Sequence, residues 1–422
     1  MERLKEYIFK EIVYARGCTE PASVAFAVAR TVSYFGNRDE VEKINIDVSN
    51  SIYKNGVDVG IPGTKKRGNL FAAAVGLISG DPEKELEVLS GIDEETILKA
   101  EKVIESKKIT LKCFCEITGV YVKVTAYGGG KTVELTVEGG HTNVVLVKIN
   151  DEKIFEKDKN EISKDYFSGK TPEDIIRFTE NAEDDYLEYI YEKAKTNYEA
   201  ALYAIESKDY TGCEYIKKLT ECKKRYDEKT IKLLVTAASM ARMGGAPVRI
   251  TSCYGSGNQG IVSLVPIFFY GNKKRISKKQ ISKALILSCL ITGLIKNKIG
   301  KLVPLCGVFY AAGVGAASGI YCLMNKTINE KDINLIINNY YSQNAGVLCD
   351  GAKETCALKA GSAAREAFEV AELTLNSPDC FSDMGIAGRD FEETINNLKI
   401  INEKSLKDFD KTMIEIIDSK GE

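Results

Sequence analysis

Three cysteines in the second half of the chain have the residue type for metal chemistry. Cys349 and Cys356 stand seven residues apart, and the turn-forming pair Asp350-Gly351 follows the first of them. On a straight α-helix this spacing would separate two side chains by about 10.5 Å, too far for one compact centre, whereas an Asp-Gly turn can fold Cys349 back. Cys306 lies upstream, at the start of an uncharged run. Three converging thiolates with one open position would suit a reactive iron–sulfur cluster, although the spacing matches none of the short ferredoxin motifs.

Cys18 lies where a helix is expected to begin. Thr19 can cap that helix, Glu20 suits its first turn, and Pro21 is tolerated there because the amides have no partner. The positive end of a helix dipole favours a thiolate, so Cys18 is a candidate catalytic thiol beside the cluster, or a cluster ligand in place of one of the three cysteines. A small buried thiol with a packing role is the alternative.

His141 is the only histidine of the chain, so a histidine base can only be this residue. It lies in the run 139–143 between two expected strands, where an ordinary hairpin loop is the alternative. Imidazole, with an unperturbed pKa of about 6.5, is well placed to accept a proton at neutral pH. Lys353 and Lys359 are the competing bases, because desolvation lowers the pKa of an amine. If His141 acts as the base, its loop must dock against the domain that holds the cysteines.

The glycine-rich run Gly255–Gly260 leads into an apolar segment. Its spacing superficially matches the dinucleotide-binding fingerprint, but no strand–helix–strand unit with an acidic partner surrounds it, so a dinucleotide site is not expected. Backbone amides of such a loop at a helix N-terminus can bind a carboxylate. An ordinary flexible turn is the alternative.

Composition excludes several classes of protein. Lys and Arg number 58 and Asp and Glu 60, a formal charge of −2 that gives no electrostatic case for nucleic acid or an anionic membrane. A single histidine excludes imidazole-rich zinc sites. Twelve cysteines in a long chain that begins with charged residues, without a signal-peptide apolar core, indicate a reducing cytoplasm and free thiols.

A chain of 422 residues is longer than one core usually serves, so two domains are expected. Alternating runs with Gly-rich turns predict an α+β domain with antiparallel strands in residues 1–150. Residues 151–170 are the expected linker, and residues 171–422 have the periodicity of a mostly helical, cluster-binding domain. The expected helices are 1–16, 22–35, 69–79, 83–89, 94–106, 183–206, 228–243, 278–296, 305–324, 330–341, 356–375 and one or two in 390–419, and the expected strands are 41–48, 109–126, 132–137 and 144–150.

The run Val303–Met324 has 22 residues without a charge, long enough to span a bilayer. It contains Gly315 and Gly319, a spacing that permits tight helix packing. Its only apolar neighbour, Ala284–Ile295, is too short to span. A buried central helix is therefore the preferred prediction, and a membrane span is the alternative.

Several stretches form an ordered set that covers nearly the whole chain: Gly17-Cys18-Thr19-Glu20-Pro21, Pro62-Gly63-Thr64, Gly140-His141-Thr142-Asn143, Arg242-Met243-Gly244-Gly245, Gly255-Ser256-Gly257-Asn258-Gln259-Gly260, Leu305-Cys306, Cys349-Asp350-Gly351-Ala352 and Cys356-Ala357-Leu358-Lys359. Together they resemble the iron–sulfur L-cysteine desulfidase family, which is related to the iron–sulfur L-serine dehydratase alpha chains. One departure is Lys65-Lys66-Arg67, which replaces a glycine-rich continuation after Thr64.

The resemblance implies α,β-elimination of L-cysteine to pyruvate, ammonia and sulfide, with a [4Fe–4S] cluster in place of pyridoxal phosphate. An open iron would act as Lewis acid for the leaving thiolate. L-serine as substrate, a cluster-based sensor of cysteine or sulfur, and a transporter fragment are the alternatives.

The implied partner is a small amino acid, with no nucleic acid and no membrane, and a homodimer stays open. The site residues expected from the resemblance and the residue chemistry are Cys18, His141 and Lys353 for catalysis; Thr64, Asn143, Ser256, Gly257, Asn258 and Gln259 for substrate binding; and Cys306, Cys349 and Cys356 for the cluster.

Overall fold

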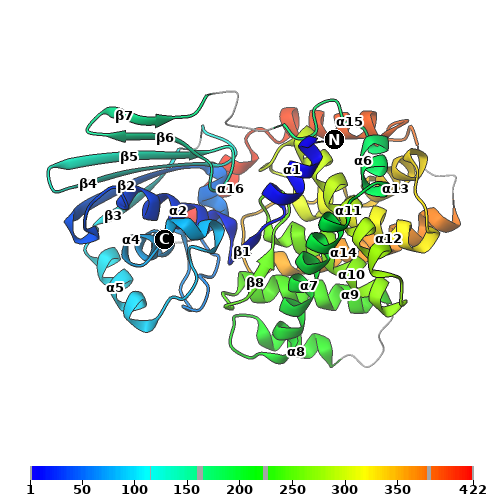
Figure 1. Ribbon diagram of the computed structural model, residues 1–422, viewed down its shortest axis with the longest axis horizontal. Coiled ribbons are helices and arrows are strands. Elements are labelled where there is room, and N and C mark those ends of the chain that lie inside the picture. Colours follow the sequence, from blue (N-terminus) through cyan, green and yellow to red (C-terminus); the bar gives the residue numbers. More distant parts are fainter. Residues whose placement is uncertain (1, 115, 159–164, 222–226, 378–381, 421–422) are drawn as a thin grey trace.

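The computed structural model describes residues 2–114, 116–158, 165–221, 227–377 and 382–420. The chain has an α+β fold, 59% helical and 14% strand, which confirms the predicted fold class. A mixed sheet and its helices form one body, the sheet body, and a bundle of helices forms the other, the helical body. The two bodies lie side by side (Figure 1).

The sheet body is built on a six-stranded sheet in the order β3-β2-β4-β5-β6-β7. Neighbouring strands run antiparallel except β2 and β3, which run parallel because helices cross over between them. Sequence patterns merged β3 and β4 into one run and did not predict β7, which is exposed throughout and falls in the expected linker. The strands are β2 (Val41–Ser49), β3 (Ile109–Phe114), β4 (Tyr121–Gly128), β5 (Lys131–Glu138), β6 (Val144–Ile149) and β7 (Glu152–Glu156).

Helices cover one face of this sheet. Helix α2 packs on β4 and β5, and α4 packs on α2 and β3. Their approach is close because a Cβ at Gly76 would lie 2.5 Å from the carbonyl oxygen of Ala25. The elements are α2 (Thr19–Val32), α3 (Asn50–Gly56), α4 (Asn69–Ile78), α5 (Glu94–Glu105) and the 3₁₀ turns η1 (Arg38–Glu40) and η2 (Pro82–Glu87), the last in place of an expected helix.

The helical body surrounds three almost fully buried elements, α10, α11 and α12. Helices α7, α9 and α14 pack around them. The elements are α6 (Pro172–Glu180), α7 (Asp184–Glu206), α8 (Cys213–Thr220), α9 (Asp227–Met243), α10 (Gly257–Lys273), α11 (Lys278–Ile299), the π-helical turn η4 (Val308–Gly313), α12 (Val314–Asn325), α13 (Glu330–Asn344), α14 (Cys356–Asn376) and α15 (Phe391–Ser405).

The uncharged run of the sequence forms η4 and α12. Residues Val308–Asn325 are long and apolar enough to cross a membrane, but 83% of this segment is buried inside the protein. Glycine explains the burial: a Cβ at Gly315 would lie 2.4 Å from Ser288 O, and one at Gly319 would lie 2.8 Å from Ala284 O. The small residues thus let α12 pack directly on α11, as a buried central helix requires.

Both ends of the chain cross to the other body. Helix α1 (Glu2–Glu11) contacts α11, and α16 (Phe409–Asp418) packs on α3 of the sheet body (Figure 1). The expectation of one helix over residues 1–16 is wrong at its end, because β1 (Tyr14–Arg16) pairs antiparallel with β8 (Arg249–Thr251). The division at residues 150 and 170 stays a prediction, and these crossings tie the two bodies together.

Candidate active site

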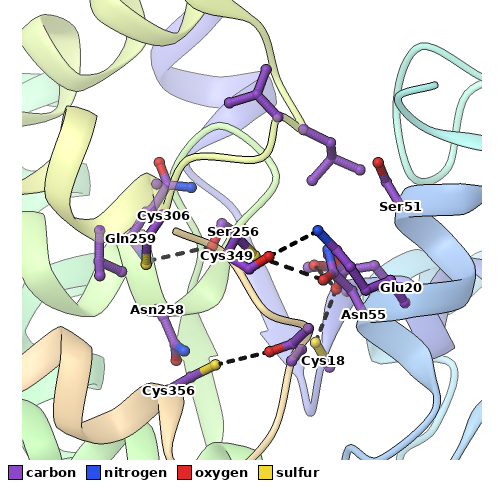
Figure 2. A pocket seen from close by; sticks show the side chains of 18 of the residues that line it. Cys18, Glu20, Ser51, Asn55, Ser256, Asn258, Gln259, Cys306, Cys349 and Cys356 are labelled. Atoms are coloured by element: carbon purple, nitrogen blue, oxygen red, sulfur yellow. Dashed lines mark hydrogen bonds between the residues drawn. The ribbon is translucent and has the colours of Figure 1, made fainter. Parts of the chain in front are cut away.

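A cavity of about 100 Å³ lies where the sheet body meets the helical body (Figure 2). The sheet body contributes the start of α2 and helix α3. The helical body contributes the end of α9, the start of α10 and two segments that contain the predicted cluster cysteines. The wall therefore combines thiols, a carboxylate, amides and a guanidinium from elements far apart in the sequence.

Cys306 and Cys349 come together through a short backbone pairing. The Cys306 amide donates to the carbonyl of Val347 at 2.8 Å, and the Cys349 amide donates to the carbonyl of Pro304 at 2.7 Å. This antiparallel bridge holds the two cysteine segments side by side. Both thiols line the cavity.

The Asp350-Gly351 turn brings Cys356 to the same cavity. Gly351 has φ +91°, a conformation that L side chains rarely adopt, and the chain reverses there before α14 begins at Cys356. The Cys356 thiol donates to the carbonyl of Gly351 at 3.4 Å. Cys306, Cys349 and Cys356 are thus brought together as the spacing argument requires.

The three thiols interact electrostatically. Burial, and then the neighbouring Cys349 and Cys356, raises the pKa of Cys306 to about 12. Burial and then Cys349 raises the pKa of Cys356. The Cys306 and Cys356 thiols therefore stay protonated until a cation displaces their protons.

The donor set is of the type that holds iron–sulfur clusters, because three cysteine thiols line one cavity. Among the residues that the structure describes, no group of three or more His, Cys, Asp or Glu side chains is arranged to hold one metal ion. In an iron–sulfur cluster the cysteine thiolates act as ligands of a polynuclear centre, so three thiols need to face one cavity without meeting at one point. Cys306, Cys349 and Cys356 meet that requirement in donor type and convergence.

Cys18 lines the cavity from the N-cap position of α2. Its thiol donates to Glu20 Oε2 at 2.9 Å. Burial first, and the Glu20 charge second, raise the pKa of Cys18. The expectation of a thiolate is not met, because desolvation and the adjacent carboxylate outweigh the helix dipole.

Glu20 is a buried carboxylate in the cavity wall, only 6% exposed. Oε2 accepts from Thr19 Oγ1 at 3.0 Å as well as from Cys18, and Oε1 accepts from Asn55 Nδ2 at 3.2 Å. Burial opposes its ionisation, but His141, the Cys18 thiol and Arg242 outweigh burial and lower the pKa of Glu20. Glu20 is therefore charged at neutral pH.

Arg242 and the first turn of α10 form a positively polarised corner. Arg242 is 3% exposed; Nε donates to Gly17 O at 2.9 Å, and Nη1 donates to Asn258 Oδ1 at 3.0 Å. Gly257 backs this contact, because a Cβ there would lie 2.2 Å from Arg242 Nε. Ser256 caps α10, so the free amides of its first turn face the same region. A helix N-terminus with a guanidinium suits a carboxylate.

Gln259 lies in the same corner and lines the cavity. A Cβ at Gly307 would lie 2.3 Å from Gln259 Nε2, so the amide packs directly on the segment that follows Cys306. In the described part of the chain, Gln259 Oε1 is buried without a hydrogen bond. An acceptor in this state is available to a bound donor.

His141 docks against the helical body, as a histidine base requires. A Cβ at Gly255 would lie 3.0 Å from His141 Nδ1, so the two loops touch. Burial lowers the pKa of His141 to about 4, opposed by Glu20 and reinforced by Lys301 and Lys296. Within the described ranges Nε2 is buried and has no partner. The imidazole is therefore neutral, with one unused ring nitrogen, although it does not itself line the cavity.

Besides His141 and Gly257, three predicted residues lie outside the cavity wall. Thr64 is buried in its turn, where its hydroxyl donates to Ile61 O at 2.9 Å. Asn143 closes the hairpin by donating to Glu138 O at 2.8 Å. Lys353 pairs with Asp350 at 2.7 Å. Their side chains are engaged in local structure, and the cavity is formed without them.

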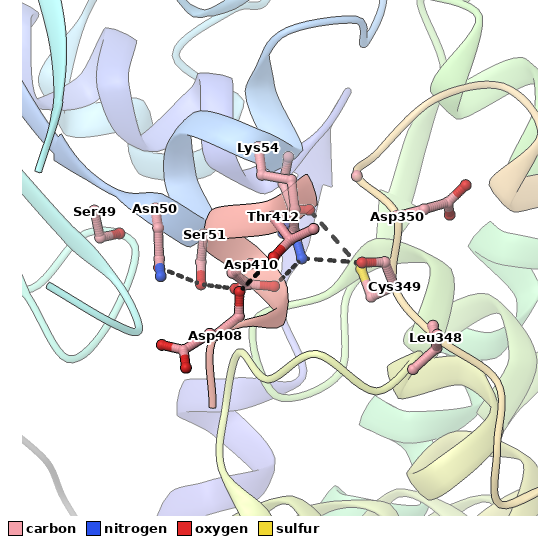
Figure 3. A network of polar contacts seen from close by, with 12 residues as sticks. Ser49, Asn50, Ser51, Lys54, Leu348, Cys349, Asp350, Asp408, Asp410 and Thr412 are labelled. Atoms are coloured by element: carbon pink, nitrogen blue, oxygen red, sulfur yellow. Dashed lines mark hydrogen bonds and ion pairs between the residues drawn. The ribbon is translucent and has the colours of Figure 1, made fainter. Parts of the chain in front are cut away.

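A buried ion pair contacts the segment that contains Cys349 (Figure 3). Lys54 of α3 pairs with Asp410 of α16, and the two side chains are 1% and 8% exposed. Lys54 Nζ also donates to the carbonyl of Cys349 at 3.0 Å. Ser51 donates to Asp410 Oδ2 at 3.3 Å. This network connects the sheet body, the C-terminal helix and a predicted cluster ligand.

Sequence reasoning gave no role at the site to four residues that meet there. Glu20 and Arg242 lie inside motifs that carry the family resemblance, so their charge within a capping or glycine-rich motif was the available signal. Asn55 and Lys54 lie in α3, which was not predicted as a helix, and no local pattern marks them. Their proximity depends on tertiary packing.

Comparison with known proteins shows the family to which the chain belongs. Residues 83–415 match the model of the serine dehydratase alpha chain family, and the chain belongs to that family. It is also similar along its whole length to proteins named UPF0597 protein. That of Kosmotoga olearia is 35% identical, covering 99% of each chain; that of Clostridium botulinum strain Langeland is 36% identical, covering 98% of this chain and 96% of the relative; that of Clostridium perfringens strain SM101 is 33% identical, covering 97% and 96%.

Proposed function

We propose that the protein is an iron–sulfur-dependent lyase that eliminates sulfide from L-cysteine in the reducing cytoplasm. The balanced reaction is L-cysteine plus water to pyruvate, ammonia and hydrogen sulfide. The Cα–H and C–S bonds break to give 2-aminoacrylate and sulfide, and water then hydrolyses the imine tautomer. The observation that carries the proposal is the convergence of Cys306, Cys349 and Cys356 on a cavity that also holds Glu20 and Arg242.

Cys306, Cys349 and Cys356 are the residues that would hold a [4Fe–4S] cluster. When bound, a cluster with one iron free of protein ligands supplies a Lewis acid at the β-substituent. Buried Lys54 and the 304–306/347–349 pairing keep the cysteine segments in place. The cavity, of about 100 Å³ in the protein alone, suits a small substrate.

The remaining tasks fall to protein side chains. The substrate carboxylate is assigned to the corner formed by Arg242, Asn258 and the free amides of α10. The Cα proton is assigned to His141, which is neutral and has an unused Nε2. Lys353 is the weaker candidate, because its Nζ is already paired with the carboxylate of Asp350 and bonded to the Asp350 carbonyl. Cys18 stays beside Glu20 as a protonated thiol and a proton donor to the departing group.

L-serine is the second candidate substrate, favoured by the name of the matching family. The test is anaerobic reconstitution with iron and sulfide, followed by pyruvate formation from L-cysteine and from L-serine, and by sulfide release from L-cysteine. We expect kcat/KM to be higher for L-cysteine. Higher kcat/KM for L-serine would make the protein a serine dehydratase, and pyruvate formation from neither would refute the lyase proposal.

A further inference from the structure

The carboxylate of Glu20 has no cationic partner of its own. It is 6% exposed, yet its three side-chain donors, Cys18, Thr19 and Asn55, are all neutral. Across the described ranges, no Lys, Arg or His nitrogen lies within 4.0 Å of it. Buried carboxylates are normally paired with a cation, because desolvating an unpaired charge is expensive. Glu20 therefore resembles one half of an ion pair.

The three cations of the cavity wall, Arg242, Lys301 and Lys54, already have other partners. Arg242 donates from Nε to the carbonyl of Gly17 and from Nη1 to Asn258 at the start of α10. Lys301, also in the cavity wall, pairs with Glu11 at 3.2 Å. A carboxylate has about four acceptor sites, and Oε1 receives a single side-chain bond, from Asn55. Glu20 thus has no direct ion pair, although Arg242 lowers its pKa from further away, and it has room for a further donor.

The Glu20 carboxylate and the first turn of α10 line the same cavity. Figure 2 shows Glu20 and Asn55 on the side of the sheet body, facing Asn258, Gln259 and Cys306 on the side of the helical body. The sheet body offers the Glu20 carboxylate, and the helical body offers Asn258, Gln259 and the free amides at the start of α10. A ligand with an ammonium and a carboxylate on one carbon, and a thiol or hydroxyl on the next carbon, matches this set of groups.

We propose that Glu20 binds the α-ammonium group of the substrate and so selects α-amino acids from other small thiols and carboxylates. An ammonium presents three N–H donors and is the cation that completes the buried ion pair. This inference rests on the proposed function for the identity of the substrate. The inference goes beyond the proposed function because it assigns the specificity for the amino group to Glu20. The sequence had indicated only that Glu20 suits the first turn of a helix.

The test separates binding of the ammonium from turnover. Glu20→Gln keeps the size of the side chain and removes the charge; its single oxygen can still accept from Cys18 and Thr19, and the bond from Asn55 is lost. Calorimetry on the anaerobic holoprotein would use two ligands that share the thiol: cysteamine, which has the ammonium but no carboxylate, and 3-mercaptopropionate, which has the carboxylate but no ammonium. We expect Glu20→Gln to weaken cysteamine binding by on the order of ten- to hundredfold, the range for a hydrogen bond to a charged group. Binding of 3-mercaptopropionate should stay the same or become tighter.

A matched control is Glu134→Gln, which removes a carboxylate of the sheet that pairs with Lys123 at 2.8 Å, away from the cavity. It should leave both affinities unchanged. Equal weakening of both ligands in Glu20→Gln, or no change in either, would overturn the proposal. Loss of cysteamine binding alone in a protein that forms no pyruvate would support the assignment of Glu20 while refuting the lyase reaction, so the two failures are distinguishable.

Discussion

The buried pair of Lys54 and Asp410 gives the sharpest prediction about what holds the site together. In Lys54→Met the Asp410 carboxylate, 8% exposed, keeps a hydrogen bond from Ser51 but loses its cation. Removing one partner of a buried ion pair typically costs about 3–5 kcal/mol, because the remaining charge is left uncompensated. We therefore expect Lys54→Met to lower the free energy of unfolding by roughly this amount.

The assay is a urea titration followed by far-UV circular dichroism, under anaerobic conditions on the metal-free protein. The double variant Lys54→Met/Asp410→Leu should recover most of the loss, since apolar replacement of a whole buried pair is often neutral. Lys99→Met is the matched control, because Lys99 pairs with Glu95 on an exposed helix face and its loss should leave the midpoint nearly unchanged. If Lys54→Met is no less stable than Lys99→Met, or the double variant is no better than the single one, the reasoning fails.

The remaining predictions concern the cavity. Burial lowers the pKa of His141 to about 4, below its unfolded value of about 6.5, so the unfolded chain binds more protons between these two pH values. The free energy of unfolding should therefore fall as the pH drops from 6.5 toward 4, by on the order of 3 kcal/mol. His141→Gln should remove this pH dependence, as urea titrations at several pH values would show. Gly257→Ala should raise KM by roughly tenfold or more with less effect on kcat, because its Cβ would lie 2.2 Å from Arg242 Nε and displace the carboxylate-binding guanidinium; Gly346→Ala, where nothing lies within 4 Å, is the control. Exchange of the substrate Cα proton with deuterated solvent, per bound iron, should fall about 10²- to 10⁴-fold in His141→Gln and persist in Lys353→Met, and the reverse order would make the lysine the base.

Much of the fold was predictable because local patterns and tertiary packing agree. The long helices α7, α9, α11 and α14 lie within one to three residues of the ranges expected from periodicity. The predictions of secondary structure failed where pairing between strands far apart in the sequence determines the structure. Residues 14–16 continue a helical pattern but become β1, because β8 offers an edge more than 200 residues later in the chain. Strand β7 has no buried residue and hence no alternation to detect.

Site residues could be predicted where their residue type alone indicates chemistry. Site residues whose role depends on burial were missed. Thiols, a unique histidine and a glycine-rich loop stand out in any sequence, and the structure brings most of them to one region. A glutamate or arginine does not stand out, because charged residues are common and usually exposed. Glu20 and Arg242 become informative once their exposures of 6% and 3% are known. The prediction of a thiolate at Cys18 was not met for the same reason. The sequence indicated the start of a helix but not the burial of the thiol beside Glu20.

The central claim is that Cys306, Cys349 and Cys356 hold a cluster on which the lyase activity depends. The direct test is anaerobic iron and sulfide analysis, with electron paramagnetic resonance of the reduced protein, on wild type, Cys349→Ser and the control Cys322→Ser, whose thiol lies in α12 away from the cavity. Wild type and Cys322→Ser should hold a full [4Fe–4S] cluster and release pyruvate, whereas Cys349→Ser should hold no stable cluster and release none. A full cluster in Cys349→Ser, or pyruvate formation by iron-free wild type, would contradict the account.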